Sequence, residues 1–146
     1  MSRNRSRRGN PFMRLALVVA GIGIFLAVAG ALSYQAFVAS RSTPLAVPIY
    51  SDAQLVANTS LGSGHDRLRY LSPSPAEEVG AFYEREIGCT RVENRVQSPD
   101  LPAFQYNCVA DGSALFLTQY TVVIVQPGVG DYAGQTLISI ERFWTQ

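Results

Sequence analysis

The sequence has no lysine, one histidine and two cysteines, and none of its 11 acidic residues precedes Asp52. All 12 basic side chains are therefore arginines, a replacement typical of GC-rich bacterial genomes. One histidine and one cysteine pair leave no second pair of ligands for a structural zinc ion. Gly128-Val129-Gly130 lacks the third glycine and the following helix of a dinucleotide-binding loop. We therefore expect neither a metal nor another cofactor.

Charge is distributed unevenly along the chain. The part before the first long apolar run holds five arginines and no acidic residue, whereas the part from Arg41 onward holds seven arginines and eleven acidic residues, a net charge of −4. A nucleic-acid-binding protein carries its positive charge on the folded domain. Here that part is acidic, so no nucleic acid is expected as a partner. The five leading arginines are Arg3, Arg5, Arg7, Arg8 and Arg14.

A run without charge separates these two parts. Residues 15–40 contain no Asp, Glu, Lys, Arg or His, and their polar side chains are confined to Ser33, Gln35 and Ser40. A helix of this length rises about 39 Å, more than the ~30 Å hydrocarbon core of a bilayer. A soluble core helix would show a polar stripe along its length. The run therefore predicts a transmembrane helix, with the lipid bilayer as its partner.

The flanking charges predict the orientation of this helix. Positive charge beside a first apolar helix stays on the cytoplasmic side, which places the N-terminus inside the cell. We expect a single-pass protein of the cell membrane with its C-terminal domain outside the cytoplasm. Its parts are a basic cytoplasmic tail (1–14), the transmembrane helix (15–40), a linker (41–48) and an extracytoplasmic domain (49–146).

A cleaved signal peptide is the alternative interpretation of the same run. Ala29-Gly30-Ala31 matches the small residues of a cleavage site. The apolar part of a signal peptide is about 7–15 residues long, whereas this run continues to Val38. An uncleaved anchor is therefore the favoured interpretation.

Small residues recur along one side of the predicted helix. Gly23, Ala27 and Ala31 are spaced by four residues, which lets a second helix approach closely. This possible helix-packing face makes other membrane protein subunits possible partners. The sequence identifies no small-molecule ligand.

The linker and the start of the domain favour extended structure. Two prolines within 41–48 prevent a regular helix there. Strands are then expected at 54–60 and 66–71, joined by a glycine-rich turn. In the second strand, apolar and arginine side chains alternate with the period of two that is typical of a half-buried strand.

Ser74-Pro75-Ala76-Glu77 is the clearest local signal in the domain. Ser74 is predicted to cap a helix, with Pro75 at the first helical position and Glu77 returning a bond to the cap. Gly88 is predicted to end this helix of about 13 residues. The helix is amphipathic and requires a sheet to cover, because four apolar residues share one face: Val79, Phe82, Tyr83 and Ile87.

The rest of the domain consists of predicted strands and turns. Asp111-Gly112 indicates a two-residue hairpin. The strand after it is rich in β-branched and aromatic residues, which favours a central position in the sheet. The fold class is α+β, with the element order β-β-α-β-β-β-β, an antiparallel sheet packed by one helix after the N-terminal transmembrane helix. The four later strands are expected at 89–97, 103–110, 114–126 and 135–144.

Cys89 and Cys108 are the only cysteines. If 89–97 and 103–110 pair as a hairpin, the two residues lie directly opposite each other, at a separation that a disulfide tolerates. Such a pair is oxidised outside the cytoplasm. Two free cysteines, or half of a metal site, are the alternatives.

His65 is followed by Asp66 in a loop rich in glycine and serine. A carboxylate can orient a catalytic imidazole, but a nucleophile and an oxyanion pocket must converge on the same place. No such set is visible, so an exposed loop histidine is the favoured interpretation. No catalytic residue is predicted, and an enzyme that uses the His65 loop remains a distant alternative.

The order of three segments resembles a family of unknown function. The segments are the P-x-Y-x-x-A opening at 48–53, Ser74-Pro75-Ala76-Glu77-Glu78-Val79, and Phe82-Tyr83 followed by Ile87-Gly88. The chain is similar in this respect to uncharacterised bacterial membrane-anchored extracytoplasmic domains. Ser51-Asp52 replaces the Pro-Gly of that pattern, and Cys89 replaces its tryptophan. The resemblance covers residues 47–110 and implies a fold and a location, but no activity.

We expect a binding or scaffolding domain without catalysis, held outside the cytoplasm by a single membrane helix. The alternative is an accessory subunit of a larger membrane protein complex, packed through the face formed by Gly23, Ala27 and Ala31.

Overall fold

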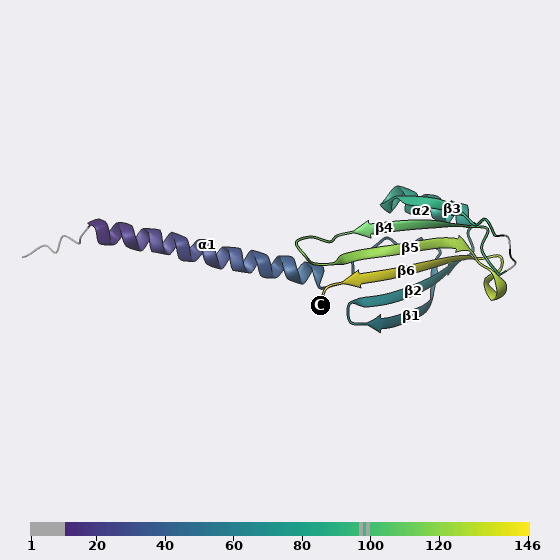
Figure 1. Cartoon of the computed structure of the whole chain (residues 1–146), viewed down its shortest axis with the longest axis horizontal. Helices are drawn as coiled ribbons and strands as arrows, with labels where there is room; N and C mark the ends of the chain where they lie inside the picture. Colours follow the sequence, from purple (N-terminus) through teal and green to yellow (C-terminus); the bar gives the residue numbers. More distant parts are fainter. Residues whose placement is uncertain (1–10, 97, 99) are drawn as a thin grey trace, which may run out of the picture. The chain divides into compact units, whose positions relative to one another are not determined.

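The computed structural model describes residues 11–96, 98 and 100–146 (Figure 1). Arg3, Arg5, Arg7 and Arg8, on which the predicted orientation depends, lie outside the described residues, as do Gln97 and Pro99. The chain forms two compact units, divided between Val38 and Ala39.

Helix α1 spans Pro11–Arg41 and contains all the described residues of the first unit. None of its 31 residues is buried, and its first turn has no acidic side chain. Its length and composition are sufficient to cross a membrane. α1 is therefore a candidate membrane span near the N-terminus.

The second unit is a six-stranded antiparallel sheet with one α-helix, as predicted. The strand order across the sheet is β1-β2-β6-β5-β4-β3, and β5 has the predicted central position. The fold class α+β and the element order are confirmed. The elements are β1 (Gln54–Gly62), β2 (His65–Ser72), α2 (Ala76–Ile87), β3 (Cys89–Glu93), β4 (Phe104–Asp111), β5 (Gln119–Pro127), the 3-10 turn η1 (Gly130–Tyr132) and β6 (Thr136–Trp144).

One face of the sheet carries the hydrophobic core. Burial alternates along β5 from Gln119 to Val125 and along β6 from Thr136 to Ile140, so that every second side chain there is buried and its neighbours are half-buried. This period of two follows from the pleat of a strand, which directs successive side chains to opposite faces. The fully buried residues of these two strands include Val123, Val125, Ile138 and Ile140.

Helix α2 covers part of this face, near β3 and β4 in Figure 1. Val79 and Tyr83 of α2 are fully buried. Gly80 lies against the ring of Tyr106, where an added Cβ would come within 2.4 Å of two ring carbons. Glycine is therefore required for this close approach of helix and sheet. Gly88 ends the helix with φ 75°, as predicted.

Residues 42–53 lie over a further part of the same face, which the sequence did not predict. The Thr121 hydroxyl donates a 2.8 Å hydrogen bond to the Leu45 carbonyl oxygen. Val47 and Tyr50 pack against the buried core. Much of the predicted linker is therefore part of the folded domain.

The predicted capping box is wrong. The residue that caps α2 is Pro75, and no side chain forms a capping hydrogen bond there. The Ser74 hydroxyl instead donates a 2.8 Å hydrogen bond to Asp52 Oδ2. Local sequence therefore identified the start of the helix but not the partner of the serine.

The predicted Asp111-Gly112 hairpin is also wrong. The backbone N–H of Ser113 donates to Asp111 Oδ1 at 2.8 Å, so these residues open a longer loop. The two-residue turn lies at Leu115 and Phe116, whose φ values are 47° and 68°. As a result, β5 begins at Gln119 rather than at residue 114.

Candidate functional site

The predicted register of β3 and β4 is confirmed. Cys89 lies opposite Cys108, and Val92 lies opposite Gln105. Cys89 and Cys108 form a disulfide, and the described residues contain no free cysteine. The bond joins an edge strand to the core, because Cys108 is fully buried.

The sheet has a second face, which points away from α2. Among the described residues of the second unit, no helix or further strand lies over it. We call it the open face. Its side chains alternate with those of the core and are half-buried or exposed. They include Arg67, Glu141, Phe143, Tyr120, Val122, Ile124 and Val109.

Three rings form a stacked row across the open face. Phe143 lies between His65 and Tyr120, its neighbours in the ladders of β2 and β5. The ring centroids are 4.1 Å apart for His65 and Phe143 and 4.5 Å apart for Phe143 and Tyr120, with interplanar angles of 19° and 18°. Stacking of this kind orders the rings and presents an aromatic strip on the surface.

An ion pair borders the aromatic row. Arg67 Nε donates a 2.6 Å hydrogen bond to Glu141 Oε1, and a second guanidinium nitrogen contacts the same oxygen. His65 Nε2 lies 3.8 Å from Glu141 Oε2. Glu141 therefore lies between the Arg67 guanidinium and the His65 ring on the open face.

The interpretation of His65 as an exposed loop residue is wrong. His65 begins β2, its ring is stacked on Phe143, and its Nε2 atom is buried. Asp66, the carboxylate proposed to orient it, is bonded instead to Arg142 Nε at 2.8 Å. Asp66 follows His65 directly in β2, and successive side chains of a strand point to opposite faces of the sheet. Adjacency in the sequence therefore did not predict the partner of His65.

A second polar cluster lies at the opposite end of β2. Asp52 accepts hydrogen bonds from the hydroxyl groups of Ser72 at 2.7 Å and Ser74 at 2.8 Å. The bond from Ser72, followed by that from Ser74, holds the pKa of Asp52 below its usual value. The Thr136 hydroxyl donates to the Ser74 carbonyl oxygen at 2.6 Å. These bonds join the chain before β1 to the segment between β2 and α2.

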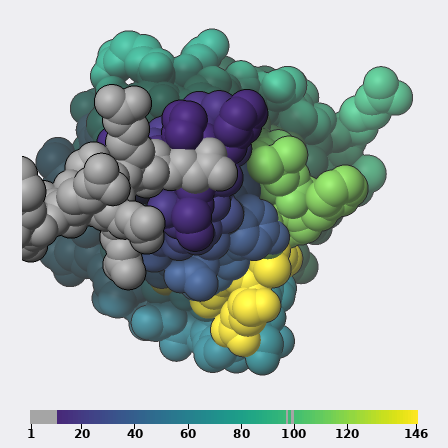
Figure 2. Space-filling model, turned by 90° about the vertical axis from the view of Figure 1, so that its left-hand side faces the viewer, coloured from purple at the N-terminus to yellow at the C-terminus, as the bar shows by residue number. Residues whose placement is uncertain are grey.

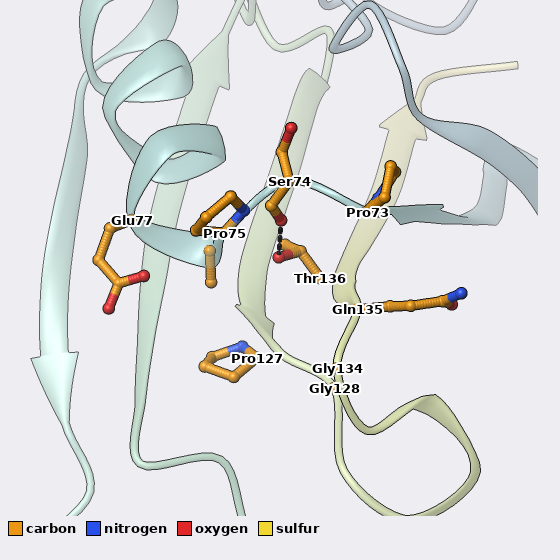
Figure 3. Close-up of a pocket in the computed structure, with 10 residues that line it drawn as sticks. Pro73, Ser74, Pro75, Glu77, Pro127, Gly128, Gly134, Gln135 and Thr136 are labelled. Carbon is orange, nitrogen blue, oxygen red and sulfur yellow. Dashed lines mark hydrogen bonds between the residues drawn. The ribbon is translucent and has the colours of Figure 1, made fainter.

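A hollow of about 350 Å³ lies beside this cluster, between the start of α2 and the loop that joins β5 to β6. Figure 3 shows the Glu77 and Gln135 side chains on opposite sides of it. Glu77 is its only charged lining residue, and the hydroxyl group of Thr136 is already bonded to Ser74. A ligand site normally has several polar groups that converge on one place, so the open face is the better candidate site.

The predicted helix-packing face shows no contact that defines its role. Gly23, Ala27 and Ala31 recur on one side of α1, and a Cβ built on Gly23 would meet nothing within 4 Å apart from its chain neighbours and the adjacent backbone of α1. Their role in helix packing stays a prediction. Among residues 11–96, 98 and 100–146, no three His, Cys, Asp or Glu side chains are grouped to hold a metal ion.

The chain was compared with protein-family models, with curated proteins and with solved structures, and none of them matches it.

Proposed function

We propose that this chain is a single-pass membrane protein that presents a protein-binding domain outside the cytoplasm. α1 is long and apolar enough to cross the bilayer. The five leading arginines favour a cytoplasmic N-terminus. The disulfide between Cys89 and Cys108 fits an oxidising compartment, which supports an extracytoplasmic domain.

The observation that carries the binding function is the open face. An antiparallel sheet with one solvated face usually has polar side chains on it. Here β5 places Tyr120, Val122 and Ile124 on that face. Five strands about 4.8 Å apart and about 25 Å long offer roughly 600 Å², approaching the ~800 Å² per partner of a standard protein interface. A flat area of this size suits a protein rather than a small molecule.

The charges of the open face suggest the chemistry of the partner. Arg67 and Glu141 neutralise each other. Arg69 is exposed and has no ion-pair partner among the described residues. A complementary partner is therefore a protein with a flat apolar surface and a carboxylate placed opposite Arg69.

Protease treatment of spheroplasts tests the topology. We expect residues 41–146 to be digested from outside, together with a known extracytoplasmic domain. Survival of the domain under these conditions would reverse the orientation. Recovery of a mature chain that begins near Leu32 would show instead that the apolar segment is cleaved.

Photocrosslinking in cells tests the binding surface. A photoreactive amino acid replaces Val109, which is 56% exposed on the open face. The matched control replaces Glu84, which is exposed on α2. We expect one discrete adduct from position 109 and none from position 84. Adding Ile124→Arg on the open face should abolish the adduct while the disulfide is retained and the domain stays folded.

Equal adducts at both positions, or an adduct that Ile124→Arg leaves unchanged, would contradict the proposal. An adduct that contains two differently tagged copies would identify a second copy of this chain as the partner. Migration as a discrete large assembly in a native gel, after mild detergent extraction, would identify an accessory subunit of a membrane complex.

A further inference from the structure

The loop between β4 and β5 has an apolar turn at its tip, and the central side chains of this turn do not pack in the core. The N–H of Leu117 donates to the Ala114 carbonyl oxygen at 2.9 Å, and the N–H of Ala114 donates to the Leu117 carbonyl oxygen at 3.1 Å. Leu115 and Phe116 occupy the two central positions, with positive φ values. Asn-Gly is preferred in such turns, since bulky side chains are strained there.

Both side chains at this turn are exposed to solvent. The exposed fractions are 71% for Leu115 and 105% for Phe116. The light-green atoms in Figure 2, from this part of the chain, project from the surface of the domain. Leu115 and Phe116 therefore add little packing energy to the domain, although their positive φ values strain the backbone. An environment outside the domain must account for them.

The base of the loop is fixed to the residues at the end of α1. The Gln119 side-chain amide donates to the carbonyl oxygens of Ser40 at 3.0 Å and Thr43 at 2.9 Å. These carbonyl groups belong to the last turn of the helix and to the residues just after it. Gln119 is 7% exposed, so this contact is part of the packed domain.

The C-terminal segment fixes the other side of the loop base. The N–H of Thr145 donates to the Thr118 carbonyl oxygen at 2.8 Å, and the N–H of Thr118 donates to Thr145 Oγ1 at 2.7 Å. The base is therefore held on both sides, and only the turn at Leu115 and Phe116 projects beyond it.

We infer that Leu115 and Phe116 insert into the interface of the bilayer from which α1 emerges, giving the domain a second membrane contact. This inference rests on the proposed membrane anchoring. The predicted span ends at Ser40, and Phe116 is three residues from Gln119, a reach of about 10 Å. The headgroup region is about 5–8 Å thick on each side of the bilayer. The turn is thus close enough to the lipid, and its side chains are of the apolar kind that enters the interface.

Lipid quenching of tryptophan fluorescence tests this contact. The full chain, with its single tryptophan removed by Trp144→Phe, carries Phe116→Trp and is reconstituted in phosphatidylcholine vesicles. The control carries Leu101→Trp, which replaces an exposed residue in the loop at the opposite end of β4. We expect the Phe116→Trp emission to shift to shorter wavelength and to be lost with lipids brominated near the carbonyl end of their acyl chains. The Leu101→Trp emission should be unaffected.

Three other results of the quenching experiment would overturn the inference. Emission from Phe116→Trp that matches the Leu101→Trp control, in protein that stays in the vesicles, overturns the inference and leaves the anchoring intact. A shift to shorter wavelength without quenching by lipid also overturns it, since protein would then cover the turn. Protein that carbonate extracts from the vesicles overturns the anchoring and the inference together.

A second variant tests whether the two residues serve the fold. Leu115→Asn with Phe116→Gly installs the residue pair that such a turn prefers. We expect the melting temperature in detergent to stay the same or to rise. A marked decrease would show that the apolar side chains stabilise the domain itself, and would overturn the inference.

Discussion

The two faces of the sheet are made by the same strands and differ in what lies over them. On the face beneath α2 and residues 42–53, side chains such as Val123 and Ile140 are fully buried. On the open face, their neighbours in the same strands are half-buried, and Val109 is 56% exposed. The composition of both faces is nevertheless rich in aromatic and aliphatic residues.

Because of this difference in burial, we expect the covered face to contribute mainly to stability and the open face mainly to binding. A side chain that folding removes completely from water contributes its full hydrophobic free energy to the fold. A half-buried apolar side chain contributes part of that free energy, and the remaining part is available when a partner covers it. Substitutions on the two faces should therefore have different consequences, even where the residues replaced are the same.

Ile140→Ala and Ile124→Ala form the sharpest test of this comparison. Ile140 is fully buried in β6, whereas Ile124 is half-buried in β5 on the open face. We expect Ile140→Ala to lower the free energy of unfolding by about 2–5 kcal/mol. We expect Ile124→Ala to lower it by less than about 1.5 kcal/mol, since less apolar area is lost from the folded state. Urea unfolding in detergent, followed by circular dichroism, measures both.

For binding, the variant on the open face should have the larger effect. Ile124→Ala is expected to weaken the crosslinked adduct from position 109, although it remains folded. Equal losses of stability for the two variants would show that something already packs on the open face, and the proposed division between the faces would then be wrong.

Removal of the disulfide has the next largest expected effect. Cys89 lies in an edge strand, and its bond to Cys108 spans a sequence separation of 19 residues. We expect Cys89→Ser with Cys108→Ser to lower the free energy of unfolding by about 3 kcal/mol, since a loop of this size restricts the unfolded chain. Membrane insertion should be unchanged. Thermal unfolding and a flotation assay measure the two effects.

Intact mass with and without reductant, after thiol alkylation, checks the bond in the unmodified protein. Two alkylated cysteines in unreduced protein extracted from membranes would contradict the bond and remove the main chemical support for an extracytoplasmic domain.

Features that depend on regular periodicity could be predicted from the sequence. The pairing of Cys89 with Cys108 follows from hairpin register, and the buried face of β6 follows from the alternation that places Ile138 and Ile140 together. Both depend only on the geometry of a strand, which is the same in every protein. The α+β order follows from these patterns and from one amphipathic helix.

Features that depend on a distant partner could not be predicted in this way. Ser74 has the local signature of a helix cap, but Asp52 competes for its hydroxyl group from 22 residues away. Asp111-Gly112 has the signature of a hairpin, but the positive φ angles occur at Leu115 and Phe116. The hydrogen bonds of the Gln119 side chain could not be predicted from a sequence pattern, because their acceptors are the backbone carbonyl groups of Ser40 and Thr43. The open face was likewise not predicted, since periodicity shows two faces but not which of them a helix covers.

The smallest expected effect at neutral pH comes from Tyr83→Phe on the covered face. Tyr83 is fully buried, and its hydroxyl group has no hydrogen-bond partner among the described residues. Because the hydroxyl group loses its hydration without gaining a hydrogen bond of good geometry, its removal should not destabilise the fold, and a gain of up to about 1 kcal/mol is expected at pH 7. An equally large loss would show that a partner binds this hydroxyl group.

The same variant should become clearly more stable than the unmodified protein at alkaline pH. Burial raises the pKa of Tyr83 to about 12 from a usual value of 10.0, and the nearby backbone of Tyr50 offsets only part of this shift. The unfolded state therefore loses its proton first, so the native state loses stability as the pH rises from about 10 to about 12. Phenylalanine has no proton to lose, so the advantage of Tyr83→Phe should grow across this range. Urea unfolding at pH 7 and pH 11 measures it, with Tyr132→Phe, an exposed residue of the β5–β6 loop, as the matched control. A difference between the two variants that stays constant with pH would contradict the burial of an ionisable hydroxyl group at Tyr83.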